Sequence, residues 1–359
     1  MSNNPRKLYI VIGCDTDPDR AGYLDGVTPD ALTWRGMTEG IPRLKDDVAS
    51  LRDHEGKSPV FTWLLRVDEQ VRRMQGSYAW VLRNHTAFLQ SLESSGDELG
   101  WHPHFWKFDD QANKWYQEAQ DVTWQIRMLQ EAHRDYMSVL PGRALSVRMG
   151  WDYHNTQTYA TLEQLGVRVE FSAIPGMCTI RRAVSAHPEN LFDWYPTPRH
   201  PFYPSRVDYR RPAAAGEEAF SLLEAPNFVS TSHLWGLVSG LQLARKMRDR
   251  SQLRRAMVRP TYWINITGRP RYFAPILTAV SRRLSDSKNA NELFVTYFHP
   301  DELLPNRTSL YSLQSMHANI ESLLRVCHSL GVAPEFIRAS QVSALVQSKL
   351  ISPAIPQLL

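Results

Sequence analysis

Short apolar runs rich in β-branched residues alternate along the chain with longer amphipathic stretches. This alternation predicts parallel strands covered by helices, because a short apolar run suits a buried strand and a longer amphipathic stretch suits a helix with one buried face. The expected strands are Leu8–Gly13, Val60–Arg66, Glu98–His102, Ala144–Arg148, Val167–Phe171, Ser221–Ala225 and Leu293–His299. The expected helices cover about 38–53, 78–95, 115–137, 154–165, 236–258 and 311–330. The pattern therefore indicates an α/β fold.

Length and composition narrow the class of protein. The chain has 359 residues, which is enough for one large α/β barrel or for two smaller domains. A content of 43% hydrophobic and 22% charged residues excludes disorder, collagen and coiled coil. Lys and Arg exceed Asp and Glu by only 41 − 37 = +4. We therefore expect no nucleic-acid partner, because that function normally needs a pronounced basic face.

One segment concentrates positive charge. From Arg245 to Arg259, seven Lys and Arg residues accompany a single Asp, a local sum of 7 − 1 = +6. Such a segment could attract a phosphate-linked or lipid-linked sugar, or an anionic membrane surface by peripheral contact. The commoner meaning of such a run is a solvated helix face, and we favour that interpretation.

The cysteines and the N-terminus bear on location. Cys14, Cys178 and Cys327 are far apart in the sequence, so neither a disulfide framework nor a cysteine-based zinc site is expected. The polar N-terminus leads only into a short apolar run, Leu8–Ile12, which is too short for a signal segment or a membrane span. We expect a cytoplasmic protein.

Two acidic residues follow the first predicted strand. Asp15 and Asp17 are two positions apart, and an extended backbone places such side chains on the same side. Two carboxylates can then face one site. The alternative is a turn around Pro18 in which the carboxylates only accept backbone hydrogen bonds.

Two histidines end the third predicted strand. Pro103 favours an extended conformation at His102, so the imidazoles of His102 and His104 can project together. Two histidines and a carboxylate from Asp15 or Asp17 would make a three-ligand site for a divalent ion, with a position left open for water. The alternative is a pair of histidines packed among aromatic residues and hydrogen-bonded to the backbone.

Further polar residues end later strands. Arg148 ends the fourth predicted strand and His299 ends a late one. The carboxyl ends of parallel strands meet at one edge, so these groups could converge with the aspartates and histidines. Alternatively, Arg148 pairs with a helix carboxylate and His299 is a capping or core residue. His154 and Glu170 could line the same pocket, and Asp152 fits the N-cap of the next helix.

Four motifs, in order, resemble the polysaccharide deacetylase family, the NodB-homology amide hydrolases of carbohydrate esterase family 4. The resemblance spans roughly residues 8 to 340. Here one residue separates the two histidines where most members have three, and Thr16 separates the aspartates. The segment Thr33–Leu44 is similar to a stretch of the undecaprenyl-linked formamidoarabinose deformylases. The matching residues are Asp15 and Asp17; Glu98-Leu99-Gly100 with His102 and His104; Arg148 followed by Leu162–Val167; and Leu293–His299.

The resemblance implies a distorted (β/α) barrel of the NodB-homology or glycoside hydrolase–deacetylase type. It would form one domain over residues 1–359, with an inserted Pro- and aromatic-rich loop at about 193–215 and a basic helical segment at about 236–259. It also implies a divalent ion held by Asp17, His102 and His104. Zinc is the first expectation, and nickel, cobalt and iron suit the same ligands. Asp15 would be the base, Arg148 would hold and tune it, and His299 would protonate the leaving amine.

The implied reaction removes an acetyl or formyl group from an amino sugar or a related small N-acyl metabolite, including one carried on a nucleotide or lipid. Aromatic side chains at Trp151, Trp194, Tyr195 and Tyr203 could stack on a sugar ring, or those of the Pro-rich loop could only close the barrel. The rival functions are an inactive carbohydrate-binding barrel, a phosphate-ester or glycoside hydrolase, and a binder of membranes or nucleic acid. The sequence leaves the oligomeric state open.

Overall fold

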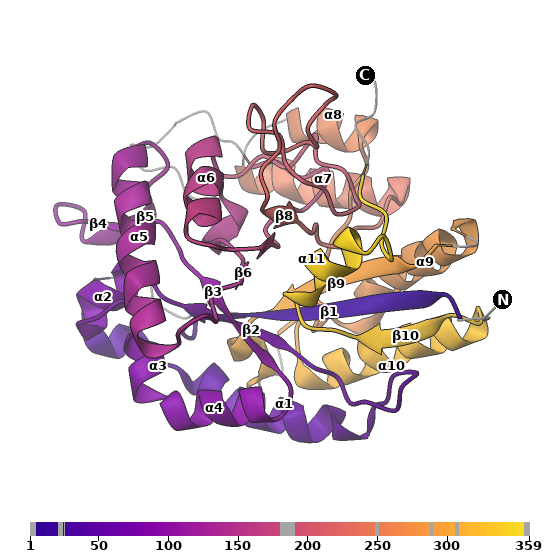
Figure 1. The fold of residues 1–359 in the computed structure, drawn as a ribbon, viewed down its shortest axis with the longest axis horizontal. Helices are drawn as coiled ribbons and strands as arrows, with labels where there is room; N and C mark the ends of the chain where they lie inside the picture. Colours follow the sequence, from indigo (N-terminus) through magenta and orange to yellow (C-terminus); the bar gives the residue numbers. More distant parts are fainter. Residues whose placement is uncertain are drawn as a thin grey trace.

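The computed structural model describes residues 5–20, 24, 26–179, 191–247, 251–287, 290–305 and 309–354. Within this part, eight parallel strands form one curved sheet in the order β10-β1-β2-β3-β6-β7-β8, with β9 paired to β1. Helices surround the sheet (Figure 1). The strands are β1 (Lys7–Thr16), β2 (Thr62–Arg66), β3 (Glu98–His102), β6 (Ser146–Val147), β7 (Val169–Glu170), β8 (Leu223–Glu224), β9 (Glu292–Phe298) and β10 (Ala333–Phe336).

The sheet curls into a distorted barrel around β1. Strand β9 runs along one side of β1, while β10 pairs with its first half and β2 with its second half. At the other end of the sheet, the chain beyond β8 returns to β9, because the Phe228 backbone N–H donates to the Val295 carbonyl at 2.9 Å. The prediction of a distorted α/β barrel is confirmed.

The helices are held by local signals as well as by packing. Side chains of Asp68, Asp121, Asn155 and Ser312 accept backbone hydrogen bonds at the starts of α2, α5, α6 and α10, as good N-caps do. The helices are α1 (Ile41–Asp47), α2 (Glu69–Gln75), α3 (Trp80–Asn84), α4 (Thr86–Ser94), α5 (Val122–Val139), α6 (Thr156–Gln164), α7 (His233–Met247), α8 (Ser251–Val258), α9 (Pro270–Asp286), α10 (Leu313–Ser329) and α11 (Gln341–Gln347).

The pleat of β1 decides which side chains face into the barrel. Leu8, Ile10, Ile12 and Cys14 belong to the large apolar core that includes buried residues of the surrounding helices. The alternate residues Tyr9 and Val11 join a second, smaller core with side chains of β7, β8 and β9. Successive strand residues point to opposite faces, so the parity of Tyr9 and Val11 continues to Asp15 and Asp17. The two aspartates therefore reach the carboxyl end of the barrel interior.

The structure corrects several predicted elements. An antiparallel hairpin of β4 (Trp106–Asp109) and β5 (Lys114–Gln117) occupies the start of a predicted helix, which begins only at Val122. The predicted helix over 236–258 is two helices, α7 and α8. Strand β10 and helices α2, α9 and α11 were not predicted. The Pro- and aromatic-rich loop contains no named helix or strand and is joined to β8 by a bridge between Phe202 and Glu224.

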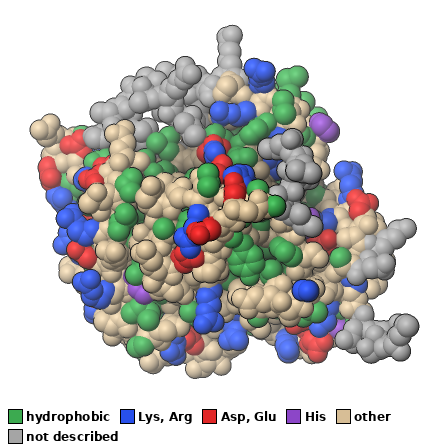
Figure 2. Space-filling model, turned by 45° about the horizontal axis from the view of Figure 1, so that its top comes forward, with side chains coloured by type: hydrophobic (Ala, Val, Ile, Leu, Met, Phe, Trp, Pro, Cys, Tyr) green, Lys and Arg blue, Asp and Glu red, His purple; other side chains and the backbone are tan. Residues whose placement is uncertain are grey.

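Side chains of both charges are interspersed over the face shown in Figure 2. Among the described residues, no helix combines the length and the apolar character needed to cross a membrane.

Candidate metal centre

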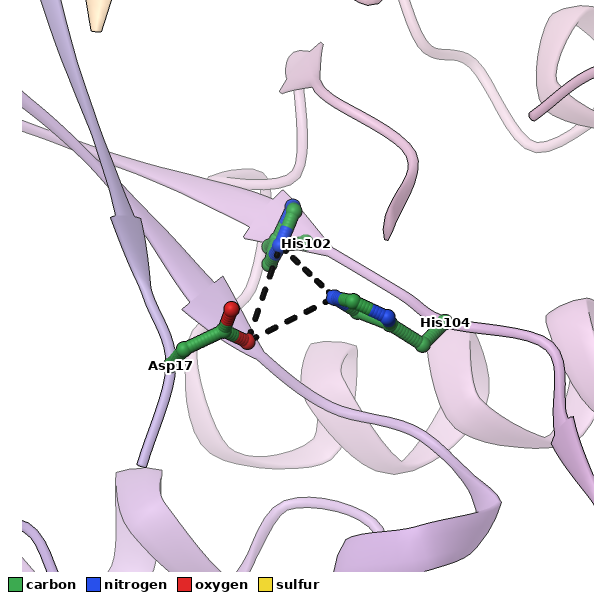
Figure 3. Close-up of side chains that lie close together, drawn as sticks. All are labelled: Asp17, His102 and His104. Carbon is green, nitrogen blue, oxygen red and sulfur yellow. Dashed lines mark hydrogen bonds and ion pairs between the residues drawn. The ribbon is translucent and has the colours of Figure 1, made fainter. Parts of the chain in front are cut away.

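Asp17, His102 and His104 come together at the carboxyl ends of β1 and β3. The Oδ1 atom of Asp17 lies 3.7 Å from His102 Nε2 and 3.4 Å from His104 Nε2, and the two Nε2 atoms are 3.0 Å apart (Figure 3). All three side chains are buried. A carboxylate oxygen and two imidazole nitrogens that face one another within 4.8 Å fit the ligand set of a divalent ion. These are the three residues that the sequence predicted as ligands.

Both imidazoles are held by groups outside the triad. The Nδ1–H of His102 donates to the Arg148 carbonyl at 2.6 Å, which leaves Nε2 unprotonated and directed at the centre. The His104 ring stacks on Trp106 with 5.6 Å between ring centroids and 11° between planes. Burial holds the pKa of His102 well below its ordinary value and also lowers the pKa of His104. Both rings are therefore neutral, as metal ligation requires.

Arg66, at the end of β2, is part of this centre and was not predicted. Its guanidinium donates to Asp17 Oδ1 at 2.5 Å and also binds the Asp68 carboxylate. Burial raises the pKa of Asp17, but contacts led by the Arg66 guanidinium outweigh it and hold this pKa well below its ordinary value. Asp17 and Asp68 together carry one more negative charge than Arg66 balances. This local charge favours a bound cation.

Asp15 lies beside the triad and is paired with Arg148. Arg148 Nε donates to Asp15 Oδ2 at 2.9 Å, whereas Asp15 Oδ1 is buried and has no hydrogen-bond partner among the described residues. As expected, Arg148 favours the ionised form of Asp15, but burial opposes it. Burial is the larger influence and raises the pKa of Asp15 to about 6, although Arg148 and His299 oppose it. A carboxylate with this pKa suits general-base catalysis near neutrality.

Arg148 is fixed by three further contacts. It donates to the Phe171 carbonyl at 2.8 Å and to Asp152 at 2.5 Å, and its guanidinium carbon lies 3.3 Å from the centroid of the Tyr297 ring. Asp152 therefore anchors Arg148 and does not cap the next helix, a role that Asn155 takes. Burial raises the pKa of Asp152 to about 7.

His299 completes the cluster at the end of β9. Its Nε2 atom lies 3.9 Å from Asp15 Oδ2 and 3.9 Å from Asp17 Oδ2. On the other side of the ring, Nδ1 lies 3.3 Å from Glu302 Oε1 and 3.2 Å from Arg20 Nη1. Burial and Arg20 lower the pKa of His299, but Glu302 and Asp15 outweigh them and the net shift is upward. The groups around His299 therefore favour its imidazolium form.

Glu302 is a second residue that sequence reasoning did not assign. It is buried, and it accepts hydrogen bonds from Thr267 Oγ1 at 2.5 Å and from Asn265 Nδ2 at 2.9 Å. It also forms an ion pair with Arg20 at 3.0 Å. These contacts fix the carboxylate beside His299 Nδ1, where it orients the ring and favours the imidazolium.

The two predicted substrate-binding tryptophans lie in different surroundings. Trp151 is half-buried next to the centre, with its ring edge-to-face on Trp106 at 4.6 Å. Its backbone φ of 54° is left-handed, which is rare for a tryptophan and marks a constrained turn between Arg148 and Asp152. Trp194 is fully buried, and its Nε1–H donates to the Asp152 carbonyl at 2.8 Å. In this structure Trp194 supports the arginine anchor and offers no free face to a sugar.

The two predicted tyrosines, Tyr195 and Tyr203, are half-buried, and their described contacts are with residues other than the three ligands. Tyr195 Oη lies 3.5 Å from the Arg255 carbonyl, and Tyr203 packs against the smaller core inside the barrel. An aromatic residue that was not predicted, Trp263, stacks on Tyr297 with 5.1 Å between centroids. Trp263 is half-buried and is joined through Tyr297 to Arg148.

His154 and Glu170 do not join the centre. Val169 and Phe171 face the smaller core, so the intervening Glu170 points to the other face of the sheet, toward α6. There His154 Nε2 lies 3.1 Å from Glu170 Oε1, and Tyr159 donates to Glu224. Burial and the neighbouring Glu170 raise the pKa of Glu224 well above its ordinary value. The two carboxyls thus share a proton.

This shared proton makes a prediction for stability. The folded protein binds the Glu224 proton more tightly than the unfolded chain, so the contribution of Glu224 to the free energy of unfolding falls as pH rises above the ordinary glutamate range, by about 1.4 kcal/mol per pH unit. Glu224→Gln keeps a donor toward Glu170 and removes the titration. The variant should therefore gain stability relative to the wild type between about pH 5 and 7.

Urea unfolding at several pH values measures this effect. Glu218→Gln is the matched control, because that side chain is 84% exposed. A stability difference between Glu224→Gln and wild type that stays constant with pH would contradict the shared proton.

Comparisons with known proteins place the fold. No protein-family model matches the chain, and no curated protein sequence matches it. A solved structure assigned as a glycoside hydrolase/deacetylase from Parabacteroides distasonis is similar over 96% of this chain and 71% of its own, at 11% identity and a TM-score of 0.53. Another, assigned as a polysaccharide deacetylase from Mycobacterium smegmatis, covers 100% and 97% at 12% identity and a TM-score of 0.48. The first of these shows that the chain has the glycoside hydrolase/deacetylase barrel fold, in agreement with the family that its motifs resemble.

Proposed function

We propose that this protein is a metal-dependent amide hydrolase that removes an acetyl or formyl group from an amino sugar or a related small N-acyl metabolite. The observation that carries the proposal is the buried triad of Asp17, His102 and His104, whose ligand atoms lie within 4.8 Å of one another. Asp15 and His299 flank this triad, so a base and an acid stand beside one metal site. The family resemblance of the motifs and the barrel fold support the same reaction.

The triad would hold the ion through Asp17 Oδ1, His102 Nε2 and His104 Nε2. A divalent ion bound there would polarise the amide carbonyl and lower the pKa of a water molecule. The ligand set suits zinc, and it also suits nickel, cobalt and iron. The neutral imidazoles and the ionised Asp17 are ready to bind it without losing protons.

Asp15 acts as the general base in this proposal. Its Oδ1 atom accepts a proton from the water that attacks the acyl carbon, while Oδ2 stays bound to Arg148. The contact with Arg148 fixes the carboxylate so that only one oxygen is available. Arg148 also favours the charged form that the base needs.

His299 acts as the general acid. An amine anion is a poor leaving group, so the nitrogen must gain a proton as the C–N bond breaks. The imidazolium of His299, maintained by Glu302, donates that proton from Nε2. The products are a carboxylate from the acyl group and the free amine.

The first experiment measures metal by elemental analysis on desalted protein, together with Asp17→Ala and His102→Ala. We expect about one divalent ion per chain in the wild type and a loss of most of it in both variants. The exposed His233 gives the matched control, and His233→Ala should keep the ion. Hydrolysis of N-acetyl and N-formyl amino sugars, measured before and after chelation, then tests the reaction itself.

The possible outcomes separate the rival functions. Absence of an ion even after reconstitution would overturn the hydrolase and leave a carbohydrate-binding barrel. Hydrolysis that survives complete chelation would favour acid–base chemistry by the carboxylates alone. We also propose that the substrate is a small molecule, free or carried on a nucleotide or lipid, and such compounds form the panel to be screened.

A further inference from the structure

Three arginines lie near one another in a part of the fold that is not in the metal centre. Arg199 lies in the Pro- and aromatic-rich loop, Arg259 follows α8, and Arg283 is in the last turn of α9. All three are partly buried, and Arg199 interacts electrostatically with both of the others. Three positive charges therefore gather in a region that is largely shielded from water.

Arg259 and Arg283 have defined partners. Most of these partners are uncharged groups. Arg259 donates to the carbonyls of Tyr195 and Thr197, and so clamps the loop. Arg283 donates to the Arg199 carbonyl at 2.9 Å, and its Nε lies 3.5 Å from Glu292 Oε2. Glu292 is thus the only carboxylate that the described residues bring to the cluster, and two positive charges remain unbalanced.

Arg199 has no such partner. Its Nε atom is buried and makes no hydrogen bond within the described residues, and no ion pair of its guanidinium is present there. Burial, together with Arg259 and Arg283, lowers the pKa of Arg199 to about 10. His200 is beside the cluster and accepts from Arg283 at 3.1 Å, and burial lowers its pKa to about 4, so it adds no charge at neutral pH.

A cation in this position is costly to the fold. Removing a charged group from water without a partner opposes folding, and buried charges are normally paired. A guanidinium presents its donors in a planar fork that matches an oxyanion, and phosphate is a common ligand for arginine clusters. A dianion would balance the two unpaired charges.

We propose that Arg199, Arg259 and Arg283 form a binding site for a phosphoryl group, with Arg199 as its main donor. This site is separate from the metal centre and does not depend on the proposed hydrolysis. It is connected to that centre by the chain itself, because Trp194, five residues before Arg199, holds the main chain of Asp152.

Thermal unfolding with inorganic phosphate tests the site. The wild type, Arg199→Gln and Arg282→Gln are titrated at constant ionic strength, with chloride replacing phosphate. Arg282 is the matched control because it is an exposed arginine next to Arg283. We expect a saturable rise in Tm for the wild type and for Arg282→Gln, and a phosphate affinity about 10- to 100-fold weaker in Arg199→Gln.

A second signature separates binding from a structural role. Without phosphate at low salt, Arg199→Gln should melt at the same temperature as the wild type or higher, because it removes an unpaired charge. Arg199→Lys keeps the charge and should retain part of the phosphate response.

Two results would overturn the site: an equal response to phosphate in wild type and Arg199→Gln, or a marked fall in Tm of Arg199→Gln without phosphate. N-Acetylglucosamine 1-phosphate identifies the source of the anion. Tighter binding than inorganic phosphate assigns the phosphoryl group to a larger ligand, and equal affinity assigns the site to free phosphate.

Discussion

Replacing Asp15 with asparagine is expected to reduce kcat by about 10²- to 10⁴-fold while the protein keeps its metal ion. Asparagine has nearly the same shape and can still contact Arg148, but it cannot accept the proton of the attacking water. Asp15 also lies outside the ligand triad, so the three metal ligands are unchanged. Activity and metal content should therefore separate in this variant, whereas both are lost in Asp17→Ala.

Steady-state kinetics and elemental analysis on the same preparations measure the separation. Asp110→Asn makes the same change of atoms at a carboxyl that is 74% exposed, and it should leave kcat and metal content unaltered. A second readout is the pH profile of kcat/KM in the wild type. The base must be deprotonated, so activity should rise with pH through a limb at or below about pH 6, because a bound cation can only lower the pKa of Asp15 further. Full activity of Asp15→Asn would remove Asp15 from the mechanism.

Most residues of this site could be predicted from the sequence because they lie at the ends of predicted strands. Asp15, Asp17, His102 and His299 each follow or end a strand on the residue parity that faces the barrel interior, and parallel strands bring those ends together. The same rule could have found Arg66, which ends a predicted strand as Arg148 does. An arginine that accompanies a metal ligand is not suggested by ligand spacing, so Arg66 was overlooked.

Other features depend on contacts that a sequence does not encode locally. Glu302 is adjacent to a recognised motif, but its role comes from Asn265 and Thr267, more than 30 residues away. Trp194 and Trp151 look alike in sequence, yet one is a buried support and the other is half-buried beside the centre. Periodicity likewise failed for α9, where the internal Pro275 is a signal against a helix that tertiary packing overrides.

Replacing Gly150 with alanine is expected to disrupt the metal centre without changing any ligand. A Cβ atom at position 150 would lie 2.0 to 2.3 Å from three atoms of the His104 ring, and the backbone there is fixed by a hydrogen bond from Gly150 N–H to the Pro103 carbonyl at 2.8 Å. His104 is itself confined by its stacking on Trp106. The ring must therefore leave its present position beside Asp17 and His102, and we expect the bound ion and the activity to be lost, with a destabilisation of about 1–3 kcal/mol.

Gly142→Ala provides a control that is matched in stability. Gly142 has a φ of 75°, and apart from its chain neighbours no described residue lies within 4 Å of the added Cβ, so alanine there is strained by its backbone alone, at a cost of about 1–2 kcal/mol. Both variants should lose comparable stability in urea unfolding, but only Gly150→Ala should lose the metal. If the two variants bind the same amount of metal, the position of His104 is not required for metal binding. Loss of the metal in Gly150→Ala alone would show that the turn from Arg148 to Asp152 positions His104. This positioning would then explain how two histidines with one intervening residue can bind the same ion.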